Sequence, residues 1–165
     1  MTLHPHAALL HTFYEAFAAR DGAAMGACYA PDAAFSDPVF PDLRGDEIGA
    51  MWSMLCRAGK DLEVRVSGIT ADDTGGRAHW EADYTFATGR KVHNVVEATF
   101  TFRDGKIATH VDDFDFRRWS RQAFGPLDLL LGWTPLLRAL VRNRAAAGLT
   151  RYRAPSRAIP RPSPR

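Results

Sequence analysis

Residues 90–119, RKVHNVVEATFTFRDGKIATHVDDFDFRRW, predict two long strands joined by a tight turn. On the outgoing strand, Asn94 and apolar side chains occupy every second position from Val92 to Phe102. A period of two places one mainly apolar face of a strand against a core. The turn falls at Asp104-Gly105, a pair that favours a hairpin because both residues tolerate positive φ.

The return strand carries polar groups on the face that should be buried. Its even positions are Ala108, His110, Asp112, Phe114 and Phe116. Ionisable groups remain on a core face only when they are paired, hydrogen-bonded or lining a cavity. We therefore expect His110 and Asp112 to border a cavity that carries the function of the protein.

The first 120 residues predict helices followed by strands. Pro31-Asp32 is expected to turn the chain, and residues 39–44 are expected to form a loop. Helices first and an antiparallel meander second are typical of an α+β domain, which we assign to residues 1–120. The expected helices are 4–20, 23–29 and 45–58, and the expected strands before the hairpin are 33–37, 62–67 and 78–86.

The composition is that of one globular domain. A hydrophobic share of 46% in 165 residues is enough for a single sizeable core. The two cysteines, Cys28 and Cys56, form neither a disulfide framework nor a metal motif. We expect no secretory signal, no membrane span and a cytoplasmic location.

Charge is distributed unevenly along the chain. Residues 117–165 contain eleven arginines and one acid, Asp128, a balance of +10, so the overall charge of +2 leaves −8 for residues 1–116. Such a basic tail is either a solvated end or a contact for an acidic partner, a membrane surface or nucleic acid. We keep peripheral membrane contact open and expect no specific nucleic acid partner.

Residues 121–153 predict an amphipathic helical extension. The part from Leu127 to Val141 is too apolar to hang free in water, and too short and interrupted to span a bilayer. In order of preference, we expect it to dock on its own domain across the open end of the sheet, on a dimer partner, or on a membrane surface. Residues 154–165 are rich in Pro and Arg and predict disorder.

The order of the elements and several short motifs together indicate a resemblance to a known fold. Residues 29–38 read YAPDAAFSDP, Arg44-Gly45 precedes the third helix, and residues 102–107 read FRDGKI. These features resemble the nuclear transport factor 2-like superfamily, which includes ketosteroid isomerase and SnoaL-like polyketide cyclases. The resemblance covers residues 5–120. It implies a cone-shaped, curved antiparallel sheet with three helices packed on its concave face and a pocket between them.

The resemblance also implies site residues. By the match, Asp37 occupies the position of the isomerase's general base. The isomerase pairs this base with an oxyanion hole made of a Tyr and a protonated Asp. In this chain those two positions fall on Phe13 and Ala98, so both donors are absent. Tyr14 lies one residue further along and faces elsewhere on its helix.

His110 and Asp112 are neighbours on one strand face because they lie two residues apart. The pair can hold an imidazole for acid-base work, and SnoaL-like cyclases similarly place acid-base residues on this strand. Alternatively it is a hydrogen-bonded pair at the sheet rim, and Asp37 is a turn residue. Asn94 can donate to a substrate oxygen or be a satisfied core amide. Aromatic residues expected to line the pocket, or simply to fill the core, are Tyr14, Phe17, Trp52, Trp80, Tyr84 and Phe114.

Two functions fit this pattern. The first is a small isomerase-like or cyclase-like enzyme that binds a small apolar carbonyl compound and transfers a proton through Asp37 or the His110–Asp112 pair. The second is a non-catalytic ligand-binding or protein-interaction domain of the same fold. Proton transfer requires no organic cofactor, and the sequence has no compact metal-ligand spacing, so we expect neither a cofactor nor a metal.

The outward face of the late strands is uncharged at its centre. Relatives of the resembled superfamily commonly pair through the convex face of the sheet. We therefore expect a homodimer through that face. The residues concerned are Val95, Thr99, Thr101, Thr109 and Val111.

Overall fold

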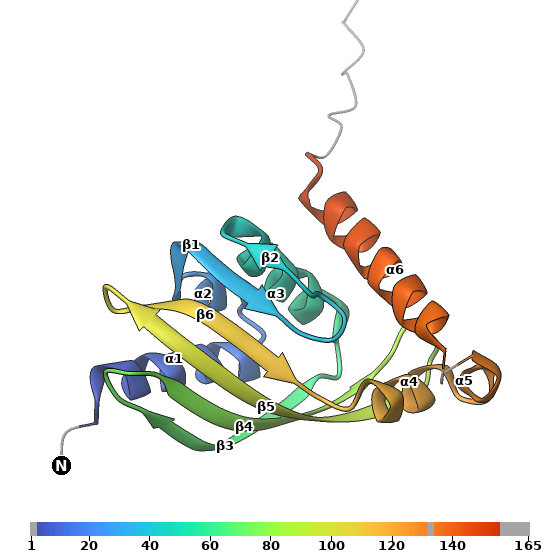
Figure 1. Ribbon diagram of the computed structural model, residues 1–165, viewed down its shortest axis with the longest axis horizontal. Helices are drawn as coiled ribbons and strands as arrows, with labels where there is room; N and C mark the ends of the chain where they lie inside the picture. Colours follow the sequence, from blue (N-terminus) through green and yellow to red (C-terminus); the bar gives the residue numbers. More distant parts are fainter. Residues whose placement is uncertain (1–2, 132–133, 156–165) are drawn as a thin grey trace, which may run out of the picture.

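A curved sheet of six strands forms the framework of the protein (Figure 1). The computed structural model describes residues 3–131 and 134–155. The strands lie in the order β2-β1-β6-β5-β4-β3, and all neighbours are antiparallel except β1 and β6. Their bounds are β1 Tyr29–Ser36, β2 Leu43–Arg44, β3 Glu63–Ala71, β4 Gly76–Thr85, β5 Lys91–Arg103 and β6 Lys106–Asp113. The α+β class and the four-stranded meander from β3 to β6 are confirmed.

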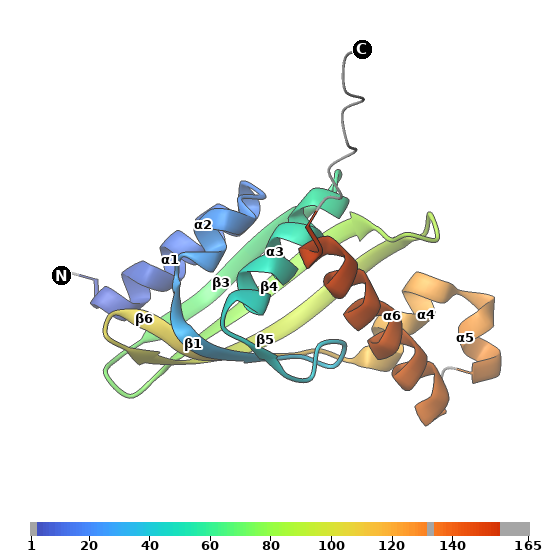
Figure 2. The same ribbon diagram turned by 90° about the horizontal axis from the view of Figure 1, so that it is seen from above.

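Three helices cover one face of this sheet (Figure 2). They are α1 (Pro5–Ala18), α2 (Gly22–Gly26) and α3 (Asp46–Ala58). Phe13 of α1 and Trp52 of α3 are buried in a core shared with Phe100 of β5. The side chain of Asp21 accepts a hydrogen bond from the Ala24 amide and caps α2, and Gly59 ends α3.

The predicted hairpin places the two polar residues of β6 on the inner face. Asp104 and Gly105 have φ of 51° and 71°, the positive values that the turn requires. His110 pairs with Phe100 and Asp112 with Ala98 across β5 and β6. Both polar side chains face the core, with only 1% of His110 and 3% of Asp112 exposed.

Three boundaries differ from the sequence prediction near β1. The helix predicted over 23–29 ends at Gly26, and Tyr29 begins β1. Pro31-Asp32 does not turn the chain but lies within β1, where the register with β6 shifts between Tyr29 and Ala34. A proline is tolerated at such an irregularity because no ladder hydrogen bond is lost there.

Two further predictions are corrected by local hydrogen bonds. Residues 39–44 are not wholly a loop, because Leu43 and Arg44 form β2 against β1. The return strand of the hairpin ends at Asp113, and Phe116 is helical. The carboxylate of Asp115 accepts hydrogen bonds from the backbone amides of Arg117 and Arg118, so it caps a helix where the alternating pattern predicted a longer strand.

The C-terminal segment forms α4 (Phe116–Phe124), α5 (Pro126–Leu131) and α6 (Pro135–Arg153), at one end of the sheet (Figure 1). Leu137 and Val141 of α6 are buried, and Arg142 Nε donates to the Pro38 carbonyl at 2.9 Å. The segment therefore docks on its own domain, the first of the three expected modes. Apart from Ala154 and Pro155, the tail predicted to be disordered lies outside the described residues. Within the described ranges, no helix combines the length and hydropathy that a membrane span requires.

Candidate functional site

A chain of hydrogen bonds runs through the core from α3 to β4. Trp52 Nε1 donates to the Tyr29 hydroxyl at 3.0 Å, and that hydroxyl lies 2.6 Å from His110 Nδ1. His110 Nε2 lies 2.9 Å from Asp112 Oδ1, which also accepts from Trp80 Nε1 at 3.2 Å. Every polar side chain in this hydrogen-bonded series is therefore paired, as burial requires.

The hydrogen-bond partners of His110 indicate which of its two ring nitrogens carries the hydrogen. Tyr29 accepts from the indole of Trp52, so its own hydrogen is free to donate to His110 Nδ1. We therefore assign the hydrogen of the imidazole to Nε2, from which it donates to Asp112. Both ring nitrogens of His110 are engaged, so this imidazole orients Tyr29 and Asp112 and does not itself face an empty space.

Aromatic rings enclose the imidazole. Phe100 is nearest, with ring centroids 4.2 Å apart, and Phe35 and Phe13 present their edges at 5.0 and 5.6 Å. The ring of Trp52 stacks at 6.1 Å. This apolar box excludes water from the chain, which strengthens its electrostatic interactions.

Asp37 lies beside this chain because of the strand register. Ser36 at the end of β1 pairs with Val111, so the next residues along the two parallel strands are Asp37 and Asp112. Asp37 Oδ1 accepts hydrogen bonds from the amides of Val39 and Phe40, at 2.6 and 2.5 Å. Oδ2 accepts none from the described residues.

The carboxyl of Asp37 is tuned to neutral pH. Burial and, to a lesser extent, the charge of Asp112 raise its pKa to about 7, while the amides of Phe40 and Val39 and the Arg142 guanidinium oppose the rise. A carboxyl with this pKa is partly ionised and partly protonated at pH 7. It can therefore both take and return a proton, as a general base or acid must.

The charges of the two acidic candidates also act on nearby tyrosines. Burial raises the pKa of Tyr14 and of Tyr29, and the charge of Asp112 raises both further. Burial likewise raises the pKa of Tyr84, and the charge of Asp37 adds to it. Tyr14 therefore lies within range of the charge of Asp112, and Tyr84 lies within range of the charge of Asp37.

The hydroxyl of Tyr14 is the one buried side-chain polar atom without a hydrogen-bond partner among the described residues. Tyr14 itself is 2% exposed and packs edge-on against Phe13 and Phe100. A buried hydroxyl without a partner costs about 1–3 kcal/mol. It is a donor available to a ligand oxygen.

The other residues predicted to line a pocket fall into two groups. Phe17, Trp52 and Trp80 are buried, with Phe17 edge-on to both indoles at 5.0 and 5.3 Å. Asn94, Tyr84 and Phe114 are half-buried, like Asp37. Asn94 shares the inner face of β5 with the buried residues on either side of it, and its amide makes no side-chain hydrogen bond to the described residues.

The C-terminal helices close this half-buried end. Trp119 of α4 donates to the Tyr84 hydroxyl at 2.8 Å, and α6 places Arg142 on the Pro38 carbonyl beside Asp37. Sequence reasoning missed Tyr29, Trp119 and Arg142 as site residues. Tyr29 opens the quoted YAPDAAFSDP motif, which is a usable signal, whereas the contact between Arg142 and Pro38 spans 104 residues and has no local signature.

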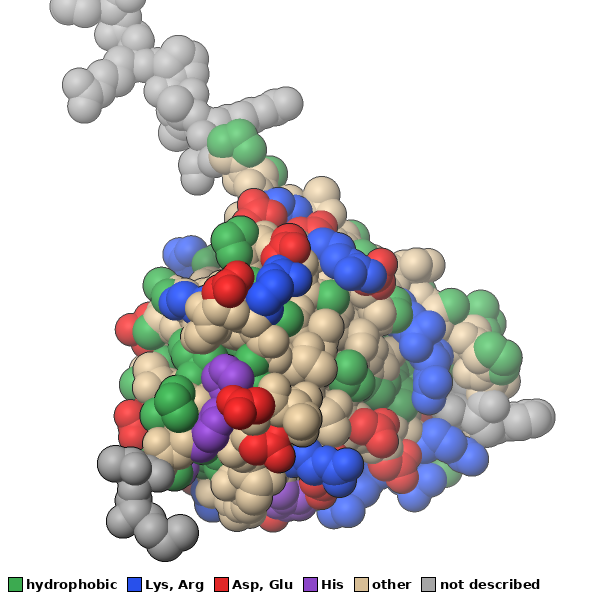
Figure 3. Space-filling view, turned by 60° about the vertical axis from the view of Figure 1, so that its left-hand side comes forward, with side chains coloured by type: hydrophobic (Ala, Val, Ile, Leu, Met, Phe, Trp, Pro, Cys, Tyr) green, Lys and Arg blue, Asp and Glu red, His purple; other side chains and the backbone are tan. Residues whose placement is uncertain are grey.

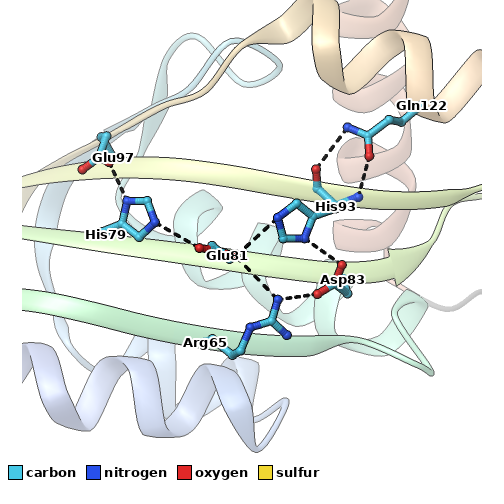
Figure 4. Close-up of polar contacts among 7 residues, drawn as sticks. All are labelled: Arg65, His79, Glu81, Asp83, His93, Glu97 and Gln122. Atoms are coloured by element: carbon cyan, nitrogen blue, oxygen red, sulfur yellow. Dashed lines mark hydrogen bonds and ion pairs between the residues drawn. The ribbon is translucent and has the colours of Figure 1, made fainter.

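The outer face of the sheet carries a separate polar network (Figure 4). His79 bridges Glu97 and Glu81 at 2.5 and 3.3 Å, and His93 bridges Glu81 and Asp83 at 3.3 and 2.8 Å. Arg65 completes it, and Gln122 of α4 holds the backbone of His93. His93 and Glu97 thus face outward and take no part in the inner site.

Two other features lie at the surface, and the second is lined in part by Tyr29. In the part of the chain that the structure describes, one group of three side chains could hold a metal ion: His4, His6 and Asp73, whose ligand atoms lie within 4.8 Å of one another. It sits at the start of α1, at the opposite end of the sheet from α4. A hollow of about 460 Å³ lies among α2, α3 and the end of α6 and is lined mainly by small residues.

Comparisons with known proteins agree with this geometry. A family model described as SnoaL-like domain matches residues 10–110, more than half of the chain. No curated protein matches.

Several solved structures have the same fold. An NTF2-like protein of unknown function from Burkholderia pseudomallei superposes with a TM-score of 0.66 at 17% identity, covering 76% of this chain and 100% of its own. A putative polyketide cyclase from Xanthomonas campestris gives 0.60 at 24% identity, covering 72% and 96%. A LEH-like epoxide hydrolase from M. tuberculosis gives 0.58 at 20% identity, covering 78% and 96%. With its inner-face acidic residues, its sheet topology and the family match over residues 10–110, this chain belongs to the SnoaL-like domain family.

Proposed function

We propose that this chain is an acid-base enzyme of the isomerase or cyclase kind, acting on a small apolar compound that carries a carbonyl group. The observation that carries the proposal is Asp37, a half-buried carboxyl with a pKa of about 7 at the edge of an aromatic core. A carboxylate suits removal of a proton from the carbon next to a carbonyl when its pKa lies near the working pH.

The inner face supplies a role for each group in such a reaction. Asp37 Oδ2 takes the proton from carbon, the C–H electron pair moves into the carbonyl, and an enolate oxygen forms. The hydroxyl of Tyr14 and the amide of Asn94, which have no partners among the described residues, donate to that oxygen. Asp37 then returns the proton to another carbon; alternatively, the enolate carbon attacks a second carbonyl of the same molecule, and the alkoxide that forms takes the proton from Asp37.

The buried hydrogen-bonded series affects the pKa of Asp37 through Asp112. The charge of Asp112 helps to raise the pKa of Asp37, and His110 holds Asp112 in place. In this proposal Asp37 is the catalytic residue, while His110 and Asp112 are positioning residues. The names of the structural relatives, which include polyketide cyclases, are compatible with this chemistry.

A second function is favoured by a specific observation. His110 and Asp112 are almost fully buried and bonded to neighbouring side chains. Such a satisfied network also suits a non-catalytic domain that binds an apolar ligand without changing it.

Hydrogen exchange distinguishes the two functions. A panel of cyclic apolar ketones is titrated by tryptophan fluorescence, and ketones that bind are then incubated in D₂O while NMR follows their α-carbon hydrogens. We expect exchange faster than in buffer, lost in Asp37→Asn and retained in Asp113→Asn, an exposed carboxylate on the other face of β6. Binding without exchange supports the second function, and failure of every ketone to bind contradicts both.

We also propose that two copies pair through the outer face of the sheet. Thr99, Thr101 and Thr109 are exposed there, and 44% of Val111 is accessible. This uncharged strip lies beside the network of Figure 4. An exposed, uncharged strip on a sheet is a suitable surface for a two-fold contact.

A further inference from the structure

The C-terminal helices divide their apolar side chains into two groups. One group, Leu137, Val141 and Leu149, is buried against the domain. The other group, which we call the leucine patch, points into solvent. Its members and their exposed fractions are Leu127 64%, Leu129 73%, Leu130 74%, Leu136 65% and Leu140 45%. Docking of α6 on its own domain therefore leaves a second apolar surface unexplained, of a kind that monomeric proteins seldom leave in water.

The leucine patch lies on two helices, α5 and α6, that follow one another in the chain. Leu136 and Leu140 lie four residues apart and share the outward face of α6. The other three members belong to α5, and both views place α5 and the start of α6 at the same extremity of the molecule (Figures 1 and 2). The patch thus forms the tip of the protein farthest from α1.

Exposed arginines continue the outward side of α6 beyond the leucines, without acidic partners among the described residues. Arg144 follows Leu140 by one helical turn, and Arg151 lies on the same side of α6. Arg144 and Arg151 are exposed, and neither pairs with a carboxylate of residues 3–131 or 134–155; the same holds for Arg117, Arg118 and Arg121 of α4. On the right-hand side of Figure 3, Lys and Arg side chains gather beside apolar ones.

The single acidic residue of this region does not offset the positive charge. Asp128 of α5 is 4% exposed and accepts a hydrogen bond from Ser120 at 2.6 Å, inside the helical unit. The exposed surface around the leucine patch is therefore apolar at its centre and cationic at its margin. Two such surfaces would repel each other if they met face to face across a two-fold axis.

We propose that the leucine patch docks on a membrane surface that contains anionic phospholipids. The leucines enter the boundary between headgroups and acyl chains, and the arginines contact the lipid phosphates. This places α5 and the outward side of α6, from Leu136 to Arg151, along the membrane surface, with the domain above it. The proposal does not depend on the chemistry of Asp37.

Flotation of the full chain with vesicles tests this surface. We expect the protein to float with vesicles of phosphatidylcholine mixed with phosphatidylglycerol, to bind phosphatidylcholine alone weakly, and to be released by added salt. Leu129→Ser combined with Leu130→Ser should weaken binding by about 100-fold or more, because each inserted leucine contributes about tenfold or more. Arg144→Gln combined with Arg151→Gln should weaken it by about 30-fold on the anionic vesicles only, at roughly fivefold for each arginine.

Matched controls use the same substitutions elsewhere. Leu3→Ser changes a leucine that is 57% exposed at the opposite end of the chain, and Arg57→Gln with Lys60→Gln removes two exposed charges near the end of α3. Both should bind like the wild type. A wild-type protein that stays unbound with anionic vesicles overturns the proposal. So does sedimentation showing that the paired leucine variant separates a dimer into monomers, because the patch would then be a contact between two copies.

Discussion

Replacing Asp37 by Asn should stabilise the protein at neutral and alkaline pH while abolishing proton transfer. Asn keeps an oxygen that can accept from the amides of Val39 and Phe40, so the local turn persists. What the substitution removes is a carboxylate that the folded state disfavours. Burial, with the charge of Asp112 added, raises its pKa from 3.8 to about 7.

The sign and size of the change in unfolding free energy follow from proton linkage. Between these two pKa values the unfolded chain has lost the proton and the folded chain has kept it, so the stability of the wild type falls as pH rises. At 1.36 kcal/mol for each pH unit between the two values, the total is roughly 4 kcal/mol as a ceiling, reached once pH exceeds about 7. Asn does not titrate, so the advantage of the variant should grow by roughly 2–3 kcal/mol between about pH 5 and pH 8 and then level off.

The difference in unfolding free energy between Asp37→Asn and the wild type is measured by urea unfolding at a series of pH values, with tryptophan fluorescence as the signal. Asp113→Asn, the exposed control, should differ from the wild type by no more than about 0.5 kcal/mol at any pH. If the difference between Asp37→Asn and the wild type is independent of pH, or if the variant is the less stable protein at about pH 8, the assignment of a raised pKa to Asp37 is wrong.

Three further outcomes are expected. Tyr14→Phe removes a buried hydroxyl that has no partner among the described residues, so the free energy of unfolding should stay equal or rise by about 1–3 kcal/mol. The variant should also bind a carbonyl ligand less tightly. Reduced stability would show that the hydroxyl has a hydrogen-bond partner. Deleting residues 124–165 removes the buried side of α6, so the melting temperature should fall and binding of a hydrophobic dye should increase; an unchanged melting temperature contradicts the docking of α6. Sedimentation should show a dimer that Val111→Glu separates, whereas a wild-type monomer at micromolar concentration refutes pairing through the outer face.

Local patterns in the sequence were sufficient for the framework of the inner site. Alternation along β5 and β6 placed His110 and Asp112 on the buried face, and Asp104-Gly105 fixed the register between the two strands. The resemblance of residues 29–38 pointed to Asp37, which the structure places beside Asp112. These features depend on period and turn chemistry, which act over a few residues.

What the sequence could not predict depends on long-range packing. Tyr29 reads as the end of a helix until the parallel pairing of β1 with β6 brings it to His110. The division of the C-terminal leucines into buried and exposed groups follows from where α6 docks, and a periodic pattern does not specify the partner of each face. The cap at Asp115 likewise overrode an alternation that continued to Phe116, because backbone amides that need acceptors favoured a helix start.

A crystal structure with a bound apolar ketone tests the central claim most directly. We expect the ligand inside the sheet, with its carbonyl oxygen within hydrogen-bond distance of Tyr14 or Asn94 and its α-carbon about 3–3.5 Å from Asp37 Oδ2. A ligand seated instead in the hollow among α2, α3 and the end of α6, with the Asp37 carboxylate facing only protein and water, would contradict it.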